Sequence, residues 1–163
     1  MRKMKKFKTM MAMMLALVSM CVAFSSCSSD DENDTVAAAK EIAGSYTSTL
    51  DMTVMGEAST YNNLTMKIEA VDDATVKVTL PACGTGMMAL PALEVPAVKF
   101  SGSNGAYAFS QESYAGTVTV NGAEKKYTVT LQGTFKDNTL TVNYSVQYGK
   151  MPAAMIGKFV CKK

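Results

Sequence analysis

The sequence predicts an all-β domain, an antiparallel up-and-down barrel of about eight strands with a short N-terminal helix. Apolar and polar residues alternate over several short segments, which is the period of half-buried strands. Turn signals such as Asn121-Gly122 separate these segments closely enough to make sequential hairpins. The 163 residues suit one domain, and antiparallel chains of this kind hide their strand edges by closing into barrels or stacking two sheets. Sequential hairpins favour the barrel.

Charge is unevenly spread along the chain. The formal net charge is +2, but residues 1–26 hold five basic residues and no acid, so the remainder carries −3. The basic balance belongs to this leader and gives no reason to expect nucleic-acid binding. The chain has no His, the commonest general base and metal ligand. Since no Gly-x-Ser-x-Gly elbow or paired acids stand in for it, we expect no catalytic residues, no metal site and no cofactor, and therefore no enzyme.

Residues 1–26 have the plan of a signal peptide. A basic start precedes an apolar run from Met10 to Phe24, which is too short to span a bilayer comfortably. The run ends in Phe24 and two serines before Cys27, and small residues before a Cys resemble the lipobox of bacterial lipoproteins. The resemblance implies cleavage before Cys27 and a membrane anchor through the lipid that this residue then carries.

Residues 27–35 form an acidic tether before the folded domain, which we expect over 36–163. Charge runs of this kind are usually solvated linkers. A serine and acidic cluster directly after a lipidated Cys also resembles the surface-export signal of lipoproteins in Bacteroides-like Gram-negative bacteria. That resemblance implies display on the outside of the outer membrane, with a periplasm-facing anchor as the alternative.

The domain opens with a helix and three strands. Residues 35–42 are predicted to form one or two helical turns that end at Gly44. Alternating strands follow over 44–54, 64–69 and 76–80. Asp72-Asp73 marks the turn between the second and third strands and is not a metal site, because a Ca²⁺ loop needs more oxygen ligands. Matching the two faces requires an odd number of loop residues, for instance three with a bulge.

Residues 81–96 interrupt the alternation. Three prolines, the last of them Pro96, exclude a regular central strand, yet the segment is apolar and includes Met87 and Met88. Two interpretations remain open. The segment either packs as a plug over one end of the core, or it forms a lid or contact surface for a ligand or partner, because flexible Met suits adaptable binding faces.

The second half of the chain is predicted as hairpins. Short strands near Phe100 and Phe109 flank a turn at 101–105. Closing the next hairpin at Asn121-Gly122 pairs Gly116 with Tyr127, so that an aromatic ring covers a strand glycine.

The clearest hairpin joins the strands 127–136 and 139–148 through Asp137-Asn138. Its register pairs Leu131 with Tyr144, and a slip of one residue would put the apolar set into water. A helical turn over 151–156 and a last strand over 158–162 complete the expected elements.

This order of elements resembles the calycin-like β-barrel lipoproteins of gut anaerobes. A short helix leads into Gly44-Ser45-Tyr46, a meander of about eight strands follows, and a closing segment runs over 149–162. Tyr46 stands where true lipocalins carry the Trp of Gly-x-Trp. The resemblance covers 42–162 and implies a calycin-like barrel and, by wider analogy, a cavity for a small apolar or amphipathic ligand.

Five tyrosines are the candidate ligand-binding residues. They either belong to the core or line a cavity in which their hydroxyls orient a ligand. They are Tyr46, Tyr107, Tyr127, Tyr144 and Tyr148. A cavity of at least about 300 Å³ lined by them would favour a binding module. A solid interior would favour a surface protein that presents its loops to a protein partner.

Two thiols remain after the leader is removed and Cys27 is lipidated. They are Cys83 and Cys161. An even pair in an oxidising compartment can form a disulfide, which here would join the apolar segment 81–96 to the last strand.

Overall fold

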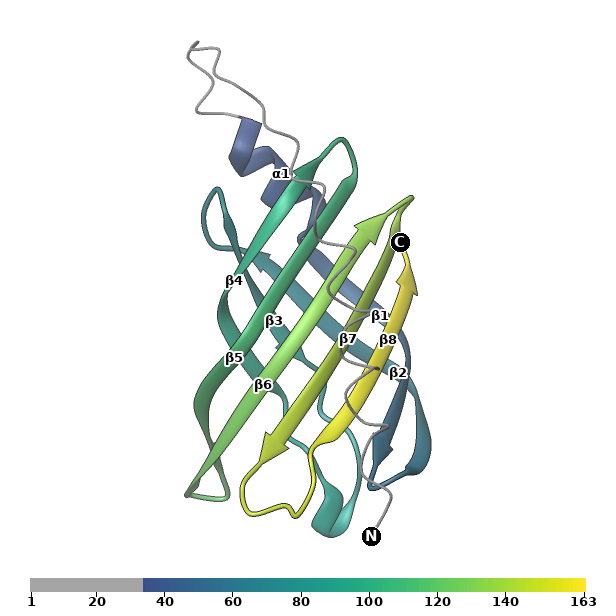
Figure 1. Cartoon of the computed structure of the whole chain (residues 1–163), viewed down its shortest axis with the longest axis vertical. Coiled ribbons are helices and arrows are strands. Elements are labelled where there is room, and N and C mark those ends of the chain that lie inside the picture. The colour runs from purple at the N-terminus through teal and green to yellow at the C-terminus, as the bar shows by residue number, and fades with distance from the viewer. Residues whose placement is uncertain (1–33) are drawn as a thin grey trace, which may run out of the picture. The chain divides into compact units, whose positions relative to one another are not determined.

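A computed structural model of the chain describes residues 34–163 (Figure 1). Its elements are α1 (Asp34–Ile42), β1 (Gly44–Val54), β2 (Glu57–Ala70), β3 (Thr75–Leu80), the short 3-10 helix η1 (Gly86–Met88), β4 (Leu93–Ser103), β5 (Ala106–Val120), β6 (Ala123–Lys136), β7 (Thr139–Tyr148) and β8 (Met155–Lys162). The strands pair in chain order, each antiparallel to the next, and β8 pairs back with β1 to close the barrel. The predicted eight-stranded up-and-down barrel with a short helix is confirmed. The predicted signal peptide, Cys27 and most of the tether lie outside the described residues.

The hairpin of β6 and β7 has the predicted register. Leu131 faces Tyr144 across the two strands. Asp137 and Asn138 have positive φ values of 51° and 57°, the left-handed conformation that a tight two-residue turn requires. The turn and the alternation of apolar residues therefore specify the same pairing.

Three aromatic rings lie directly against strand glycines inside the barrel. A Cβ atom added to Gly116 would lie 2.5 Å from Cζ of Tyr127, so the ring occupies the space that a side chain would take. Gly133 with Phe109 and Gly157 with Tyr144 repeat this arrangement. The predicted cover of Gly116 by Tyr127 is confirmed, and the small residues let large rings fill a narrow barrel.

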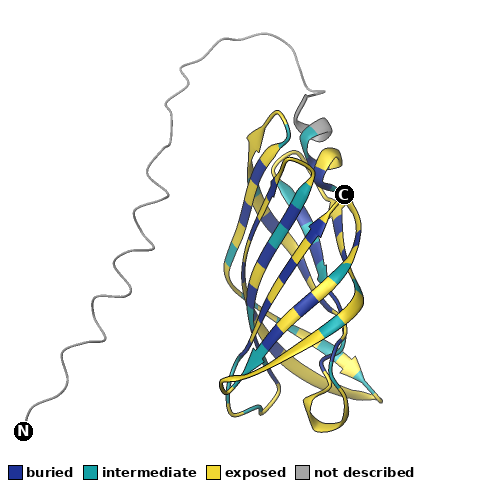
Figure 2. Ribbon diagram, turned by 90° about the vertical axis from the view of Figure 1, so that its right-hand side faces the viewer, coloured by how far each residue is buried: buried dark blue, intermediate teal, exposed yellow. Residues whose placement is uncertain are grey.

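The middle of the barrel is solid. Figure 2 shows buried and exposed residues alternating along the strands, as side chains of period two require. The inward side chains of Leu50, Met66, Val78, Val129, Val142, Val146 and Phe159 are all 0% exposed. A cavity wide enough for a ligand would leave such side chains accessible to a water molecule from inside, so these layers are close-packed.

Helix α1 closes one end of the barrel (Figure 1). Ala39 and Ile42 are buried in the core. The hydroxyl of Tyr46 donates a 2.7 Å hydrogen bond to the carbonyl of Ile42, and the hydroxyl of Tyr107 donates one of 2.6 Å to Oε2 of Glu41. Two strands thus hold the last turn of the helix against the barrel. Within the described residues, no helix is long and apolar enough to cross a bilayer.

The bounds of two elements need correction. β2 begins at Glu57, directly after the tight turn of Met55 and Gly56, and is longer than the predicted strand over 64–69. The helical turn predicted over 151–156 is wrong, because Met155 already pairs with Val146 in β7 and starts β8. Pairing with two neighbouring strands satisfies its backbone better than an isolated turn could.

Five residues lie between Ala70 and Val76, the last paired residues of β2 and β3, and the fifth of them, Thr75, already belongs to β3. The number is odd, as predicted, although the prediction gave three as its example. Asp72 stabilises the loop, since its Oδ1 accepts a 2.9 Å hydrogen bond from the backbone N–H of Ala74. This bond lowers the pKa of the Asp72 carboxyl.

The prolines were expected to exclude a regular central strand over 81–96, but β4 already begins at Leu93 and includes Pro96. β4 passes through Pro96 by means of a bulge, in which Pro96 and Ala97 lie opposite the single residue Lys77 of β3. A bulge leaves a residue outside the hydrogen-bonded ladder, so the missing N–H of proline costs no pairing there.

Candidate functional site: the open seam between β4 and β5

The barrel wall is open over part of one strand junction. β4 and β5 pair only near their shared hairpin, from Ser103 with Ala106 to Lys99 with Ser110. Beyond that point, residues 93–98 of β4 pair only with β3, and residues 111–120 of β5 pair only with β6. We call these two facing stretches the open seam.

Irregularities in both strands explain why they part. β4 carries the bulge at Pro96 and Ala97, and β5 has a shift in its register with β6 between Gln111 and Tyr114. Bulges bend a strand and increase its twist, so these two turn β4 and β5 away from each other beyond the pair of Lys99 with Ser110. The seam opens where these bulges begin.

A groove of about 330 Å³ lies in the open seam. One side comes from β3, β4 and the residue before β4, and the other from β5 and β6. It is lined by Thr79, Ala92, Glu94, Pro96, Tyr114, Thr117, Val118 and Tyr127. The mixture of apolar and hydroxyl-bearing side chains makes this groove suited to an amphipathic occupant.

Tyr127 bridges the open seam. Its hydroxyl donates a 2.7 Å hydrogen bond to the backbone carbonyl of Glu94, which has no β5 strand beside it. Its ring packs against that of Tyr114, with the ring centres 6.1 Å apart. Burial raises the pKa of the Tyr127 hydroxyl, and the nearby Tyr114 raises it further, so the group stays a proton donor. A side chain thus replaces one missing hydrogen bond between strands.

A second groove, of about 360 Å³, lies against the segment that links β3 to β4. Its lining comprises Ala82, Cys83, Gly84, Ala89, Leu90, Pro91, Val120 and Tyr148. Cys83 and Leu90 hold this segment closed by exchanging backbone hydrogen bonds of 3.0 and 2.8 Å. Gly84 has a φ of +79°, and a Cβ there would lie 2.5 Å from the carbonyl oxygen of Met88, so the turn requires glycine.

Both earlier interpretations of the segment 81–96 describe part of it. Pro81, Cys83 and Leu90 are buried and cover the core, as expected of a plug. Met87 is 96% exposed and Met88 is also exposed, so these methionines cover nothing within the described residues.

The five candidate tyrosines do not line one cavity. Tyr127 lines the groove of the open seam and Tyr148 lines the second groove. Tyr46 and Tyr107 direct their hydroxyls to α1. The hydroxyl of Tyr144 is buried and has no hydrogen-bond partner among residues 34–163, and burial followed by the proximity of Cys83 raises its pKa.

Sequence reasoning missed Tyr114 and Val118 as residues of the groove. Alternation places Tyr107, Phe109 and Gln111 on the inner face, and the next inward residue is Tyr114, three positions on. That break in the period of two was the one available signal of the bulge.

The predicted disulfide between Cys83 and Cys161 does not form, and both residues are buried free thiols. Cys83 lies beside Tyr148 at one end of β7, whereas Cys161 pairs with Leu140 near the other. Eight residues of strand separate these two positions of β7, a distance of roughly 26 Å, whereas a disulfide allows less than about 7 Å between Cα atoms. The Cys161 thiol instead donates to the carbonyl of Thr47 at 3.4 Å.

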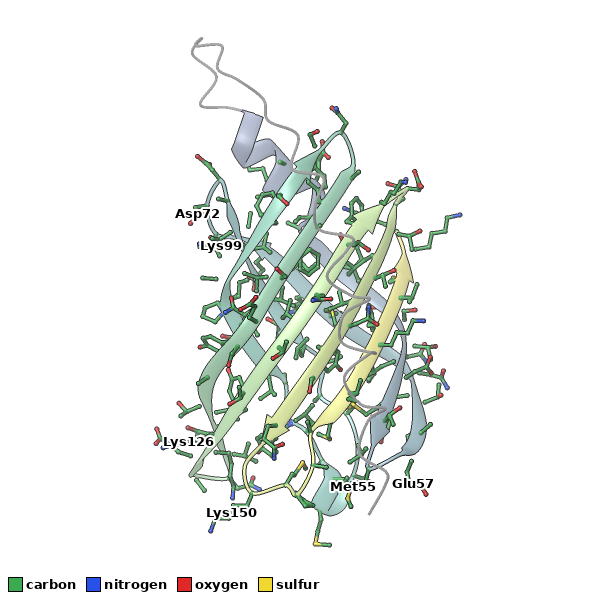
Figure 3. All side chains as sticks on the ribbon, in the orientation of Figure 1. Met55, Glu57, Asp72, Lys99, Lys126 and Lys150 are labelled. Atoms are coloured by element: carbon green, nitrogen blue, oxygen red, sulfur yellow. The ribbon has the colours of Figure 1, made fainter. Side chains whose placement is uncertain are left out.

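No group of three His, Cys, Asp or Glu side chains in residues 34–163 is placed to hold a metal ion. The charged residues of the open seam are Glu94 and Glu112, both exposed. Lys126 lies on β6 opposite Thr117, toward the end of the barrel farther from α1 (Figure 3).

An antiparallel barrel of eight strands in chain order, with a helix over one end, defines a calycin-like protein. The chain belongs to the family of the calycin-like β-barrel domain, whose family model matches residues 42–162. No curated protein matches the sequence.

A crystal structure of a protein from Bacteroides fragilis, named a "putative outer membrane protein", has a similar fold, with a TM-score of 0.65 and 22% sequence identity. The similarity covers 77% of this chain and 52% of that one, so the present chain spans about half the length of that protein. At this identity, the likeness concerns the fold alone.

Proposed function

We propose that the protein is a lipid-anchored lipoprotein of the outer membrane that binds a protein partner at its open seam. The observation that carries this proposal is the contrast between a solid interior and an open wall. Inward side chains such as Val129 and Val142 are 0% exposed, whereas the groove of about 330 Å³ opens between β4 and β5. A carrier that encloses its ligand needs the reverse arrangement.

The anchor is proposed at Cys27, with the protein displayed on the cell surface. The lipobox-like residues before Cys27 and the acidic tether after it support this, as does the name of the structurally similar Bacteroides fragilis protein. Cys27→Ser should abolish labelling by a palmitate analogue and move the protein from the membrane to the soluble fraction. Protease added to intact cells should remove the wild-type protein, and its survival would favour a periplasm-facing anchor.

The proposed role is non-catalytic, because calycin-like barrels are typically binding or structural folds. Nothing in the charge distribution favours a nucleic acid as the partner: the chain beyond residue 26 has a formal net charge of −3.

A second candidate function is the binding of a small apolar or amphipathic ligand in the open seam. The volume of the groove and its lining by Tyr114, Val118 and Tyr127 favour this candidate, since ligand pockets begin at about 300 Å³. It places the ligand in the wall of the barrel and not in its centre.

Two measurements on the protein in its own cells test the proposal. A photo-crosslinking residue at Thr117, in the groove, should capture a protein partner, whereas the same residue at Thr134 should not. Thr134 is a fair control because it is exposed on β6, between strands paired on both sides. Native mass spectrometry of the purified lipoprotein should find no small molecule; a stoichiometric one, together with no crosslink at Thr117, would establish the second candidate instead.

A further inference from the structure

The open seam exposes two strand edges. Each edge strand presents backbone N–H and C=O groups on its unpaired side at alternate residues. Within residues 34–163, the stretch 111–120 of β5 has no strand beside it on the side of β4. An extended polypeptide is the partner whose chemistry matches such a row of donors and acceptors, because it carries the same groups at the same spacing.

The edge of β5 lacks the features that usually block strand addition. Proline, lysine and bulges are the common protections of an edge. Beyond its bulge, β5 runs through Tyr114-Ala-Gly-Thr-Val-Thr-Val120 without a proline or a charged residue. The opposite edge, in β4, is protected by Pro96 and by the hydrogen bond from Tyr127 to Glu94. The structure therefore favours addition to β5.

Charge indicates what kind of segment fits. The unpaired stretches carry Glu94 and Glu112 and no basic residue. Lys125 and Lys126 are on β6, opposite Val118 and Thr117, so a strand added to the free side of β5 would lie two strand spacings from both, about 10 Å, which is near the screening length at physiological salt. Lys99 lies where pairing with β5 has resumed. Lys77 is bound to Glu69 at 2.7 Å and interacts more weakly with the charge of Glu94. The added strand therefore meets carboxylates.

The same charges count against two other occupants. The chain's own tether, residues 27–35, contains four acids and no base, so it would add like charges to the seam. A second copy of the chain would bring the same two carboxylates and no base in its own unpaired stretches. Neither occupant neutralises Glu94 and Glu112.

We propose that an extended peptide segment bearing Lys or Arg binds in the open seam by adding a strand to β5. This rests on the proposed function, and it names the class of partner. The segment's backbone pairs with 114–120, its basic side chains approach Glu94 and Glu112, and its inward side chains meet Val118 and the ring of Tyr127.

Defined peptides test this inference on the detergent-solubilised lipoprotein. The probe is a nine-residue peptide of alternating Val and Ser with Lys at both ends and a fluorescent label, and its counterpart has Glu at both ends. We expect the Lys peptide to bind at least about tenfold more tightly at low salt, because cross-strand charge pairs change from attractive to repulsive. Amide hydrogen exchange should slow in 114–120, and methylating alternate backbone nitrogens of the peptide should abolish binding.

Charge reversal supplies the matched control. The double variant Glu94→Lys and Glu112→Lys should prefer the Glu peptide. The double variant Glu57→Lys and Asp73→Lys changes the net charge equally at exposed sites outside the seam and should keep the preference for Lys.

Three results would overturn the inference: no slowing of exchange in 114–120 with either peptide, equal binding of the methylated peptide, or a dimeric mass with this edge protected in the absence of peptide. If crosslinks at Thr117 to a partner persist in cells in the first two cases, the inference alone has failed. If those crosslinks are absent as well, the proposed function has failed with it.

Discussion

The hydroxyl of Tyr127 lies 2.7 Å from the main-chain carbonyl oxygen of Glu94, across the open seam. The two residues belong to β6 and β4, which are not neighbours in the barrel. A side-chain hydrogen bond thus spans a position where the intervening strand β5 does not pair with β4. This contact therefore links β4 to β6 over the stretch where β4 and β5 do not pair.

Tyr127→Phe removes that hydrogen bond and keeps the ring. We expect the free energy of unfolding to fall by about 0.5–1.5 kcal/mol, the usual net value of one such bond. Urea denaturation measures this loss, and amide exchange in 93–98 should become faster. Tyr61→Phe is the control, because the Tyr61 hydroxyl makes no hydrogen bond within residues 34–163, and its stability should stay nearly unchanged. Equal losses in both variants would contradict a bridging role for Tyr127.

Tyr144→Phe should have the opposite effect. The Tyr144 hydroxyl is buried and finds no hydrogen-bond partner in the described part of the chain, so its removal relieves a desolvation cost of roughly 1–3 kcal/mol. Thermal and urea denaturation at pH 7 should therefore show a more stable protein. Tyr46→Phe, which removes the bond to Ile42, should instead destabilise it. A destabilised Tyr144→Phe variant would mean that this hydroxyl has a partner in solution, such as a buried water.

Stability should fall above about pH 10. Burial raises the pKa of Tyr144 in the folded state, so this group is neutral in the folded protein when it is already ionised in the unfolded chain. Ionisation of Tyr144 does not affect the free energy of unfolding below the unfolded pKa of about 10. As pH rises from there toward the folded pKa, the free energy of unfolding falls by about 1.4 kcal/mol per pH unit. Urea midpoints between pH 8 and 11.5 measure the slope. Tyr144→Phe should make the fall shallower, and an unchanged slope would exclude Tyr144 as a cause.

Gly133→Ala should destabilise the barrel through overpacking. Its Cβ would lie 2.1 Å from Cζ of Phe109, and the core around that ring is close-packed. We expect a loss of about 1–3 kcal/mol, measured by denaturation. Phe109→Leu in the same chain should recover part of it, because the smaller side chain makes room for the methyl group. Strictly additive effects of the two substitutions would argue against this contact.

Both Cys83 and Cys161 should react with a thiol reagent after denaturation without reductant. Their separation along the barrel prevents a disulfide even in an oxidising compartment. Peptide mapping of the labelled protein identifies each cysteine. A peptide that contains both residues linked would contradict the structure. Reductant should accordingly leave the melting temperature unchanged.

Local sequence patterns were sufficient to predict most of the fold. Alternation along 127–136 and 139–148 specifies an inner face, and Asp137-Asn138 can adopt the positive φ of the turn, so the register of β6 and β7 followed from neighbouring residues alone. The hairpin at Asn121-Gly122 was predictable for the same reason. Chain-order hairpins then favoured an up-and-down barrel.

The contacts of the candidate site were harder to predict from the sequence than the strands. The predicted tyrosines lay on the inner face, but their roles depend on the partners of their hydroxyls, which alternation along a strand does not identify. Tyr46 binds a helix end four residues earlier, Tyr107 binds Glu41, and Tyr144 meets no partner. The distance between Cys83 and Cys161 likewise depends on which ends of which strands they occupy.

By itself, the sequence determined the strand periodicity, the turns and the side of each strand that is buried, because these depend on residues one to a few positions apart. Only the tertiary structure decided where the wall opens. That opening arises because bulges in the consecutive strands β4 and β5 bend the two strands away from each other beyond their shared hairpin. Alternation within one strand does not specify the direction in which a bulge turns it relative to its neighbour, so the open seam emerges only in the assembled barrel.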